Sequence, residues 1–339
     1  MLTDLEIKTT AKWISEVQLR NGLIPWYSGG HIDPWNHIEA VIALGMAGFD
    51  ESAIKGVDSL FSLQNRDGSF CHYYLTNGVK EPNRDPNVIS YCALGLLALH
   101  SCIENLDVER YFPFVERALD YVVMYQRDDG SFPMMITPEG LCHPKSLLAG
   151  SCSILNSLEA GSFLAGIVDI EKPEWKRAHE SLGDFIYSSD SRVVADKSSW
   201  AMDWYYPYLA NIPRFGGQGL GLGPHREIGR FFVSGSGVRC ISGRDWFTAA
   251  ETAEASIAFS LSGMNEAATE IFWTTNRFRG EDGSYLTGLV YPSQASYPHE
   301  ERSTYTAAAV IIANDVISSG IFGSLGEFFI ERWLRRHHR

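Results

Sequence analysis

The stretch LFSLQNRDGSF, residues 60–70, has two further versions along the chain. They are VVMYQRDDGSF at 122–132 and FRGEDGSYLTG at 278–288, and NGLIPWYSG at 21–29 is a degenerate fourth copy. Each of the three full copies follows an amphipathic segment and contains Asp-Gly-Ser followed by an aromatic residue. Asp-Gly favours a turn because Gly accepts positive φ and the Asp side chain bonds to its own backbone. The chain is therefore a repeat whose unit is a helix followed by a fixed turn.

Two kinds of helical segment alternate along the chain. The first kind is rich in Ala, Gly, Ser and Leu on almost every side, which suits helices buried on most faces. Its members are 34–48, 86–100, 145–166, 201–211, 246–263 and 303–318. The second kind is amphipathic, with charge on one side. Its members are 4–19, 51–64, 108–126, 174–188 and 265–277, and a weaker one near 225–233. Within 201–211 we expect the helix to end at Pro207.

This alternation predicts an all-α fold, an (α/α)6 toroid of alternating inner and outer helices. A run of α-hairpins that closes on itself needs no polar capping repeat, whereas the alternative architecture, an open solenoid, does. A β-rich fold is disfavoured because period-two alternation is scarce outside 231–241. We expect residues 1–339 to form a single toroid domain.

The bulk composition excludes several functions. The 339 residues carry a net charge of −13, which argues against nucleic acid as a partner because phosphate binding needs clustered Lys and Arg. The N-terminal residues lack the basic and apolar regions of a signal peptide, and no apolar run reaches the ~20 residues of a membrane-spanning helix. The six cysteines form no Cys-x-x-Cys pair, which favours free thiols. We therefore expect a cytoplasmic protein.

The C-terminal stretch is unusual for an acidic chain. Phe322, Leu325, Phe329 and Trp333 fall on one helical stripe, and basic residues follow them. We expect 321–339 to form an amphipathic, basic helix. Such a helix can pack on the toroid, or it can make peripheral contact with a membrane surface, which would suit a lipid substrate.

The repeats resemble those of a known family. QNRDGSF (64–70) and DGSYLTG (282–288) look like the QW-type repeats of squalene and hopene cyclases, and they also resemble the α-α toroid of protein prenyltransferase β subunits. Uncharacterised bacterial proteins described as prenyltransferase-like are similar over the whole length. The resemblance covers most of the chain as a repeat architecture. It implies a toroid whose central cavity takes an isoprenoid or another hydrophobic small molecule.

Polar and aromatic residues gather where the predicted inner helices begin. In a toroid the long loops that enter these helices all meet at one end, so their side chains converge. The candidate catalytic carboxyls are Asp33, Glu39, Asp85, Asp203, Glu251 and Glu301. The candidate substrate-binding residues are His31, Trp35, Asn36, Asn87, Lys145, Trp204, Tyr205, Tyr206, Arg239, Arg244, Trp246, His299 and Tyr305.

Glu39 and Glu251 are the most informative of these carboxyls. Residues such as Asp85, which directly precede a helix, are explained equally well as N-caps. Glu39 and Glu251 instead lie past the helix start, among Ala and other apolar residues, and a carboxylate is rarely buried there without a partner. Either they pair with a cation such as Lys145 or Arg244, or they face a wet central cavity.

Several motifs of the related enzymes are missing. No Asp-x-Cys occurs for zinc, and the only Asp-Asp pair, at 128–129, belongs to a turn, so we expect neither a metal nor a cofactor. The Asp-x-Asp-Asp motif of protonation-initiated cyclases is also absent. The nearest sequence starts at Asp85, with Asn87 where the acid would stand.

Two enzyme functions follow from these observations. The first is a terpenoid-cyclase-like reaction in which a carboxylic acid protonates an isoprenoid and aromatic rings stabilise the cation. The second is a carbohydrate-active toroid, that is a glycoside hydrolase, lyase or epimerase, with Asp33 or Glu39 paired with Asp203 or Glu251. A toroid that only binds a ligand is a third reading. The strongly apolar inner helices favour a hydrophobic guest and hence the first function.

Overall fold

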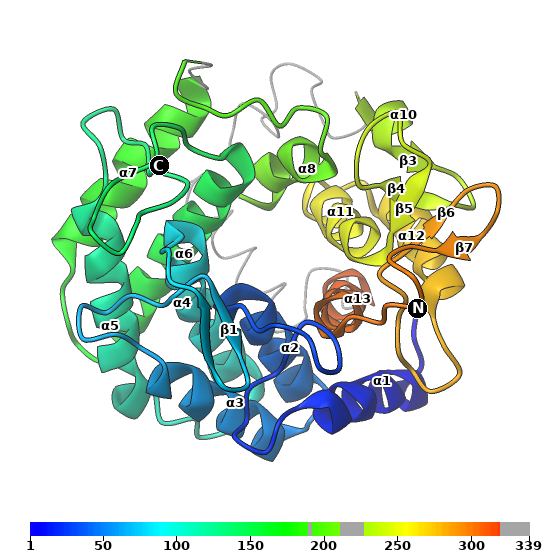
Figure 1. Ribbon diagram of the computed structural model, residues 1–339, viewed down its shortest axis with the longest axis horizontal. Coiled ribbons are helices and arrows are strands. Elements are labelled where there is room, and N and C mark those ends of the chain that lie inside the picture. Colours follow the sequence, from blue (N-terminus) through cyan, green and yellow to red (C-terminus); the bar gives the residue numbers. More distant parts are fainter. Residues whose placement is uncertain (189–191, 211–226, 319–339) are drawn as a thin grey trace.

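The computed structural model describes residues 1–188, 192–210 and 227–318. Within them, the small-residue helices form an inner ring around a central axis (Figure 1). These helices are α2 (Pro34–Met46), α4 (Pro86–Cys102), α6 (Leu148–Ile167), α8 (Ala201–Leu209), α11 (Ala249–Leu261) and α13 (Thr304–Ser318). Each packs against the next one, and α13 packs against α2, so the ring is closed. The predicted (α/α)6 toroid is therefore confirmed, and the open solenoid is excluded.

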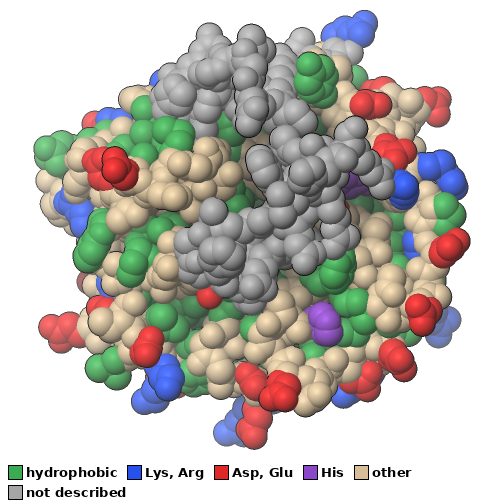
Figure 2. All heavy atoms as spheres, turned by 180° about the vertical axis from the view of Figure 1, so that it is seen from behind, with side chains coloured by type: hydrophobic (Ala, Val, Ile, Leu, Met, Phe, Trp, Pro, Cys, Tyr) green, Lys and Arg blue, Asp and Glu red, His purple; other side chains and the backbone are tan. Residues whose placement is uncertain are grey.

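The amphipathic helices lie outside this ring (Figure 1). They are α1 (Asp4–Val17), α3 (Asp50–Ser62), α5 (Val108–Met124), α7 (Pro173–Ser188) and α12 (Asn265–Trp273), the last followed by the 3-10 helix η2 (Thr274–Phe278). The weak outer helix expected near 225–233 is only the short α10 (Ile228–Phe231). On the face opposite to that of Figure 1, acidic and basic side chains are mixed around the periphery (Figure 2).

The repeated turn joins neighbouring outer helices. The Gln64 side-chain amide donates to the carbonyl of Gly68 in its own turn, at 3.0 Å, and to the carbonyl of Phe114 on α5, at 2.8 Å. Gln126 makes the same pair of bonds to its own turn and to α7. The Asp67 carboxylate accepts from the backbone N–H of Ser69, at 3.0 Å. The motif thus satisfies its own polar groups and fixes the next outer helix.

The aromatic residue of each turn is an anchor in the core. Phe70, Phe132 and Tyr285 are all buried. Gly68 has a φ of +91°, and a Cβ there would lie 2.2 Å from the carbonyl oxygen of Arg117 on α5. Only glycine therefore allows this close approach.

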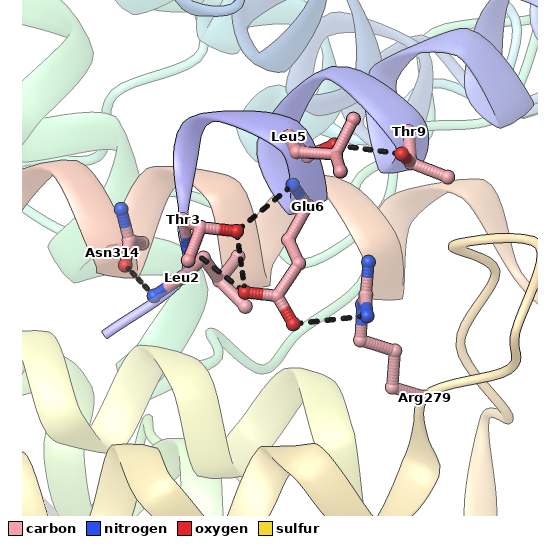
Figure 3. A network of polar contacts seen from close by, with 7 residues as sticks. All are labelled: Leu2, Thr3, Leu5, Glu6, Thr9, Arg279 and Asn314. Atoms are coloured by element: carbon pink, nitrogen blue, oxygen red, sulfur yellow. Dashed lines mark hydrogen bonds and ion pairs between the residues drawn. The ribbon is translucent and has the colours of Figure 1, made fainter.

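The N-terminal segment closes the ring of helices (Figure 3). Helix α1 packs against α13, the last inner helix, and the backbone N–H of Leu2 donates to the Asn314 side chain at 2.7 Å. Thr3 caps α1 in a capping box with Glu6, and Glu6 also pairs with Arg279 at 3.1 Å. The two ends of the toroid are thus joined by specific polar contacts.

Small strands lie on the loops that enter the inner helices. A hairpin of β1 (Tyr73–Leu75) and β2 (Gly78–Glu81) precedes α4. An antiparallel sheet follows the strand order β3 (Phe232–Val233), β4 (Gly237–Arg239), β5 (Trp246–Thr248), β6 (Gly288–Val290) and β7 (Ala295–Ser296). Strands of two to four residues are too short to show period-two alternation, so the sequence signal was confined to 231–241.

One predicted helix end is wrong. Helix α8 continues through Pro207 to Leu209. Pro207 has no N–H to donate to the carbonyl of Asp203, but burial of the helix offsets this loss. The predicted C-terminal helix over 321–339 lies outside the described residues.

Candidate active site

Asp33 lies where α2 begins and is its N-cap. Its side chain is 4% exposed. One carboxylate oxygen accepts from the Asn36 backbone N–H at 2.8 Å, and the other accepts from the Asn36 side-chain amide at 2.5 Å. Burial raises the pKa of Asp33 to about 6, although the bonds from Asn36 act in the opposite direction. Asp33 is therefore held rigidly and has a pKa close to neutral.

Glu39 lies deeper in the ring, about one and a half turns further along α2. It is 6% exposed, and the Tyr91 hydroxyl of α4 donates to its carboxylate at 2.6 Å. Burial, and then the charge of Asp33, raise its pKa to about 7. The cations considered as partners are elsewhere: the Lys145 ammonium donates to the backbone carbonyl of Arg192 at 2.7 Å, and Arg244 is exposed.

Two further carboxyls come from α11. Glu251, in the first turn, accepts a hydrogen bond from the Cys240 thiol at 3.1 Å. Glu254, one turn deeper, accepts from the Tyr205 hydroxyl of α8. Burial raises the pKa of Glu254 well above its ordinary value, and the charges of Glu39 and Glu251 add to this effect. We call Asp33, Glu39, Glu251 and Glu254 the central carboxyl cluster.

A cavity lies next to this cluster in the middle of the ring. Its polar wall is formed by Glu39, Tyr91, Ser153, Asn156, Tyr206 and Glu254. Its apolar wall, nearer the C-terminal ends of the inner helices, is formed by Ile42, Leu94, Leu209, Ile257, Ala309, Ile312 and Val316. The cavity is thus polar and acidic at one end and apolar at the other.

Aromatic side chains at the cluster have different surroundings. Trp35 meets Tyr91 edge to face, with ring centroids 5.5 Å apart, and lies 6.5 Å from Tyr206. Tyr305 at the start of α13 packs against Trp26. Trp204 instead stacks on Phe231 in the core, so it supports the helices rather than lining the cavity.

The remaining predicted carboxyls lie around the mouth of the ring. Asp85 is the N-cap of α4, and burial raises its pKa. Asp203 lies in the first turn of α8, where burial raises its pKa to about 6. Glu301 accepts a hydrogen bond from the Thr287 hydroxyl at 2.9 Å. These three carboxyls lie, like Asp33 and Glu251, at or just before the starts of inner helices, whereas Glu39 lies deeper and lines the cavity.

Other predicted binding residues have partners outside the centre. Arg239 pairs with Asp245 at 3.3 Å, and the Trp246 indole donates to the carbonyl of Tyr297 at 3.0 Å. His299 is exposed. These residues belong to the sheet β3–β7 and its loops, not to the central carboxyl cluster.

Sequence reasoning missed several residues of the site. Glu254 follows Glu251 by one helical turn in WFTAAETAEAS and satisfies the same criterion, a carboxyl among small apolar residues. Tyr91 lies in the apolar run of α4 and gave no separate signal. Tyr73 begins the hairpin that the sequence did not predict, and His72 directly precedes it.

The described part of the chain contains no group of three or more His, Cys, Asp and Glu side chains that could hold a metal ion. None of its helices combines the length and apolar character needed to cross a bilayer.

Comparison with solved structures agrees with the toroid fold. The chain superimposes on a D-mannose isomerase with a TM-score of 0.71 and 10% identity, covering 91% of this chain and 96% of that one. A glycosidase gives a TM-score of 0.71 and 12% identity over 93% and 96% of the two chains. At these identities the likeness shows the fold alone.

A much nearer relative identifies the family. The chain is 36% identical over 330 residues to MMP endo-(1,4)-3-O-methyl-alpha-D-mannosidase of Mycolicibacterium hassiacum, covering 95% of this chain and 90% of the relative. The chain therefore belongs to the family of this mannosidase, and it is an enzyme. No protein-family model matches it.

These findings overturn the resemblance to terpenoid cyclases and prenyltransferases and the hydrophobic isoprenoid substrate that it implied. The repeated Asp-Gly turns join outer helices whether the enzyme is terpenoid-cyclase-like or carbohydrate-active. They therefore indicate the toroid and say nothing of the reaction. The apolar inner helices misled for a physical reason. Their large aliphatic side chains line the deep end of the cavity, whereas Glu39, Tyr91, Tyr206 and Glu254 line the other end.

Proposed function

We propose that this enzyme is a glycoside hydrolase that cleaves α-mannosidic bonds within (1→4)-linked chains of 3-O-methylmannose. The observation that carries the proposal is the 36% identity to a mannosidase of that specificity over nearly the whole chain. The central carboxyl cluster supplies the chemistry, because glycosidases use a pair of carboxyl groups as acid and as base or nucleophile.

The carboxyls of this cluster are available for proton transfer. Within the described residues, none of the four takes part in an ion pair with Lys or Arg. Their partners are instead neutral donors: the Asn36 amide, the Tyr91 and Tyr205 hydroxyls and the Cys240 thiol. A neutral partner orients a carboxyl group without fixing it in the ionised form.

We place the cleaved bond between Asp33 and Glu251, at the mouth of the ring. An enzyme that cuts inside a chain must let the sugars on both sides of the bond extend away from it. The deep cavity beside Glu39 and Glu254 ends in an aliphatic wall, which offers a sugar chain no hydrogen-bonding partners. Asp33 and Glu251 instead lie at the starts of α2 and α11, where the entry loops leave the ring.

We assign Asp33 as the general base and Glu251 as the general acid. Both oxygens of Asp33 already accept bonds from Asn36, which suits a base that keeps its position while it takes a proton from water. Its pKa of about 6 keeps it ionised at neutral pH and makes it a stronger base than an ordinary aspartate. Glu251 is half-buried at the start of α11, and α13 is the one inner helix that lies between α11 and α2 on that side of the ring.

The reaction then proceeds in one displacement. Water attacks the anomeric carbon as its proton passes to Asp33, and the proton of Glu251 passes to the departing glycosidic oxygen. The anomeric configuration is inverted. Glu39 and Glu254 lie at the floor of the site, where they accept hydrogen bonds from the Tyr91 and Tyr205 hydroxyls and where burial raises the pKa of both carboxyls.

The proposal is tested by incubating the purified enzyme with (1→4)-linked 3-O-methylmannose oligosaccharides and following the products by mass spectrometry and proton NMR. We expect cleavage inside the chain and initial release of the β-anomer. A wild-type enzyme that hydrolyses no α-mannoside would contradict the function, and release of the α-anomer would contradict the displacement by water.

A further inference from the structure

A group of buried polar atoms lies beside Asp33 without partners. Among the described residues, no group makes a hydrogen bond with the Trp26 indole N–H, His31 Nε2 or His72 Nδ1. The Asn87 side-chain oxygen, two residues past the N-cap Asp85, is likewise unpartnered, but Asn87 lies toward Gly150 of α6. Buried polar atoms in folded proteins nearly always have a partner, so several such atoms in one place point to a ligand that supplies the missing bonds.

The rings that carry these atoms form a continuous wall. The centroid of Trp26 lies 4.8 Å from that of His31, and His31 lies 4.7 Å from Tyr73. Tyr73 in turn lies 4.1 Å from His72, and Tyr305 of α13 extends the wall beyond Trp26. The wall thus runs from the start of α13, past the entry to α2, to the hairpin β1–β2.

This wall is fixed beside the proposed base. Ile32 and Tyr74 exchange two backbone hydrogen bonds, of 2.9 and 2.8 Å, which attach the hairpin to the residue directly before Asp33. A positive charge on His72 lowers the pKa of both Asp33 and Asp85, so His72 lies near both carboxyls. The unpartnered atoms are therefore held next to the reacting bond.

The chemistry of the wall fits a neutral sugar. Indole and imidazole groups offer hydrogen bonds to hydroxyl groups, and the ring faces offer apolar surface to the C–H face of a sugar. An anionic ligand is disfavoured because carboxyls surround the wall. Burial raises the pKa of Tyr73 to about 12, and the charges of Asp33, Glu81 and Asp85 contribute to this shift.

We propose that Trp26, His31 and His72 form a sugar subsite that binds a neutral mannose residue of the chain next to the residue that is cleaved. This inference rests on the proposed function and deepens it. The subsite makes the enzyme prefer long chains, because a short substrate that occupies only the position of cleavage leaves these atoms unpartnered.

The test is the kinetics of His72→Gln on oligosaccharides of increasing length. We expect the KM ratio of variant to wild type to rise from about twofold for the shortest cleaved substrate to about tenfold for the longest, since one hydrogen bond to the sugar is lost. Trp26→Phe, which removes the indole N–H and keeps an aromatic ring, should show the same trend. His100→Gln, at an exposed histidine near the end of α4, is the matched control.

A KM ratio that is the same at every chain length for both variants would overturn the subsite while leaving the hydrolase proposal intact. If the wild type hydrolyses none of these substrates, the proposed function fails, and the subsite is judged by calorimetric titration with the longest oligosaccharide. Weaker binding to His72→Gln than to wild type and His100→Gln would then support it, and equal binding would overturn it.

Discussion

The turns after the outer helices and the mouth of the inner ring follow opposite rules. The turns repeat one arrangement, with Gln64 and Gln126 making the same pair of bonds and Gly68 and Gly130 having the same positive φ. The segments that enter the inner helices repeat nothing: one carries Asp33, another a hairpin, another a sheet. Repetition therefore marks the residues that build the toroid, and departure from repetition marks those that carry the reaction.

The largest expected effect is on kcat, and it distinguishes two helix N-caps, Asp33 of α2 and Asp107 of α5. Asp33→Asn should lower kcat by roughly 10²–10⁴-fold, because it removes the base, while the free energy of unfolding is maintained. Glu251→Gln should lower kcat similarly on natural chains and much less on a mannoside with a good leaving group. Asp107, which caps the outer helix α5 by accepting from the Arg110 N–H, provides the control.

Asp107→Asn should leave kcat within a factor of two of the wild type, measured per folded molecule. Equal losses of activity in Asp33→Asn and Asp107→Asn would show that Asp33 is only a helix cap. The mouth of the inner ring would then not differ in role from the outer helices and their turns.

The second effect concerns stability and the turns. Gly68→Ala should lower the free energy of unfolding by about 3 kcal/mol, because the new Cβ meets the Arg117 carbonyl at 2.2 Å and φ is positive. Gly48→Ala has the same strained φ, +76°, but no atom within 4 Å, so about 1–2 kcal/mol is expected. Urea titration followed by circular dichroism measures both.

A Gly68→Ala variant as stable as Gly48→Ala would mean that the close approach of the turn to α5 contributes nothing. A Gly68→Ala variant that folds but has lost its kcat would contradict the assignment of the turns to architecture alone.

The third effect is the pH dependence of stability at Glu39. Its pKa is about 7 in the folded state against an ordinary 4.5, so the folded state binds the proton more tightly than the unfolded chain. Stability is therefore lost as pH rises from about 4.5 through 7, by up to roughly 3 kcal/mol. Glu39→Gln should match the wild type near pH 4.5 and exceed its free energy of unfolding at pH 8.

Glu6 in the network that closes the ring should behave in the opposite way. Its pKa is lowered, chiefly by the backbone hydrogen bond from Thr3, so its ionised form stabilises the fold. Glu6→Gln should be less stable than the wild type at pH 8 and approach it at acid pH. If Glu39→Gln and Glu6→Gln changed the free energy of unfolding at pH 8 in the same direction, the contrast between the active site and the contacts that hold the toroid together would be wrong.

The smallest effect concerns the thiol beside the proposed acid. Cys240→Ala should lower kcat by about three- to tenfold, since Glu251 loses the donor that orients it, and Cys240→Ser should recover most of this loss. Cys92→Ala also removes a buried thiol from the molecule, but that thiol points to the Ile89 carbonyl of its own helix, and kcat should not change. Identical kcat values in the alanine and serine variants at Cys240 would exclude the positioning role.

Much of the fold was predictable because its signals are local. Helical periodicity and Asp-Gly turns are each set within about a dozen residues, so the order of inner and outer helices could be predicted before any contact was known. The sheet β3–β7 was not predictable, because its strands of two or three residues are held by partners far along the chain, such as Phe247 with Leu289.

The site was predictable in part. Glu39 and Glu251 were found because a carboxyl among alanines needs an explanation, and Glu254 satisfied the same criterion and was missed. Tyr91 and Tyr205 looked like ordinary core residues, and only their hydrogen bonds to Glu39 and Glu254 distinguish them. The reaction was predicted wrongly because the resemblance rested on turns that serve the architecture.

The sequence by itself determined the alternation of helices, the fixed turns and the carboxyls buried in apolar helices, since each depends on neighbours along the chain. The tertiary structure decided which of these carboxyls share a site. Glu39 and Glu254 are 215 residues apart and meet only because α13 packs against α2 and closes the ring. The closed ring also turns the polar end of the inner helices toward the mouth and the aliphatic end toward the deep cavity, so composition alone could not reveal the nature of the substrate.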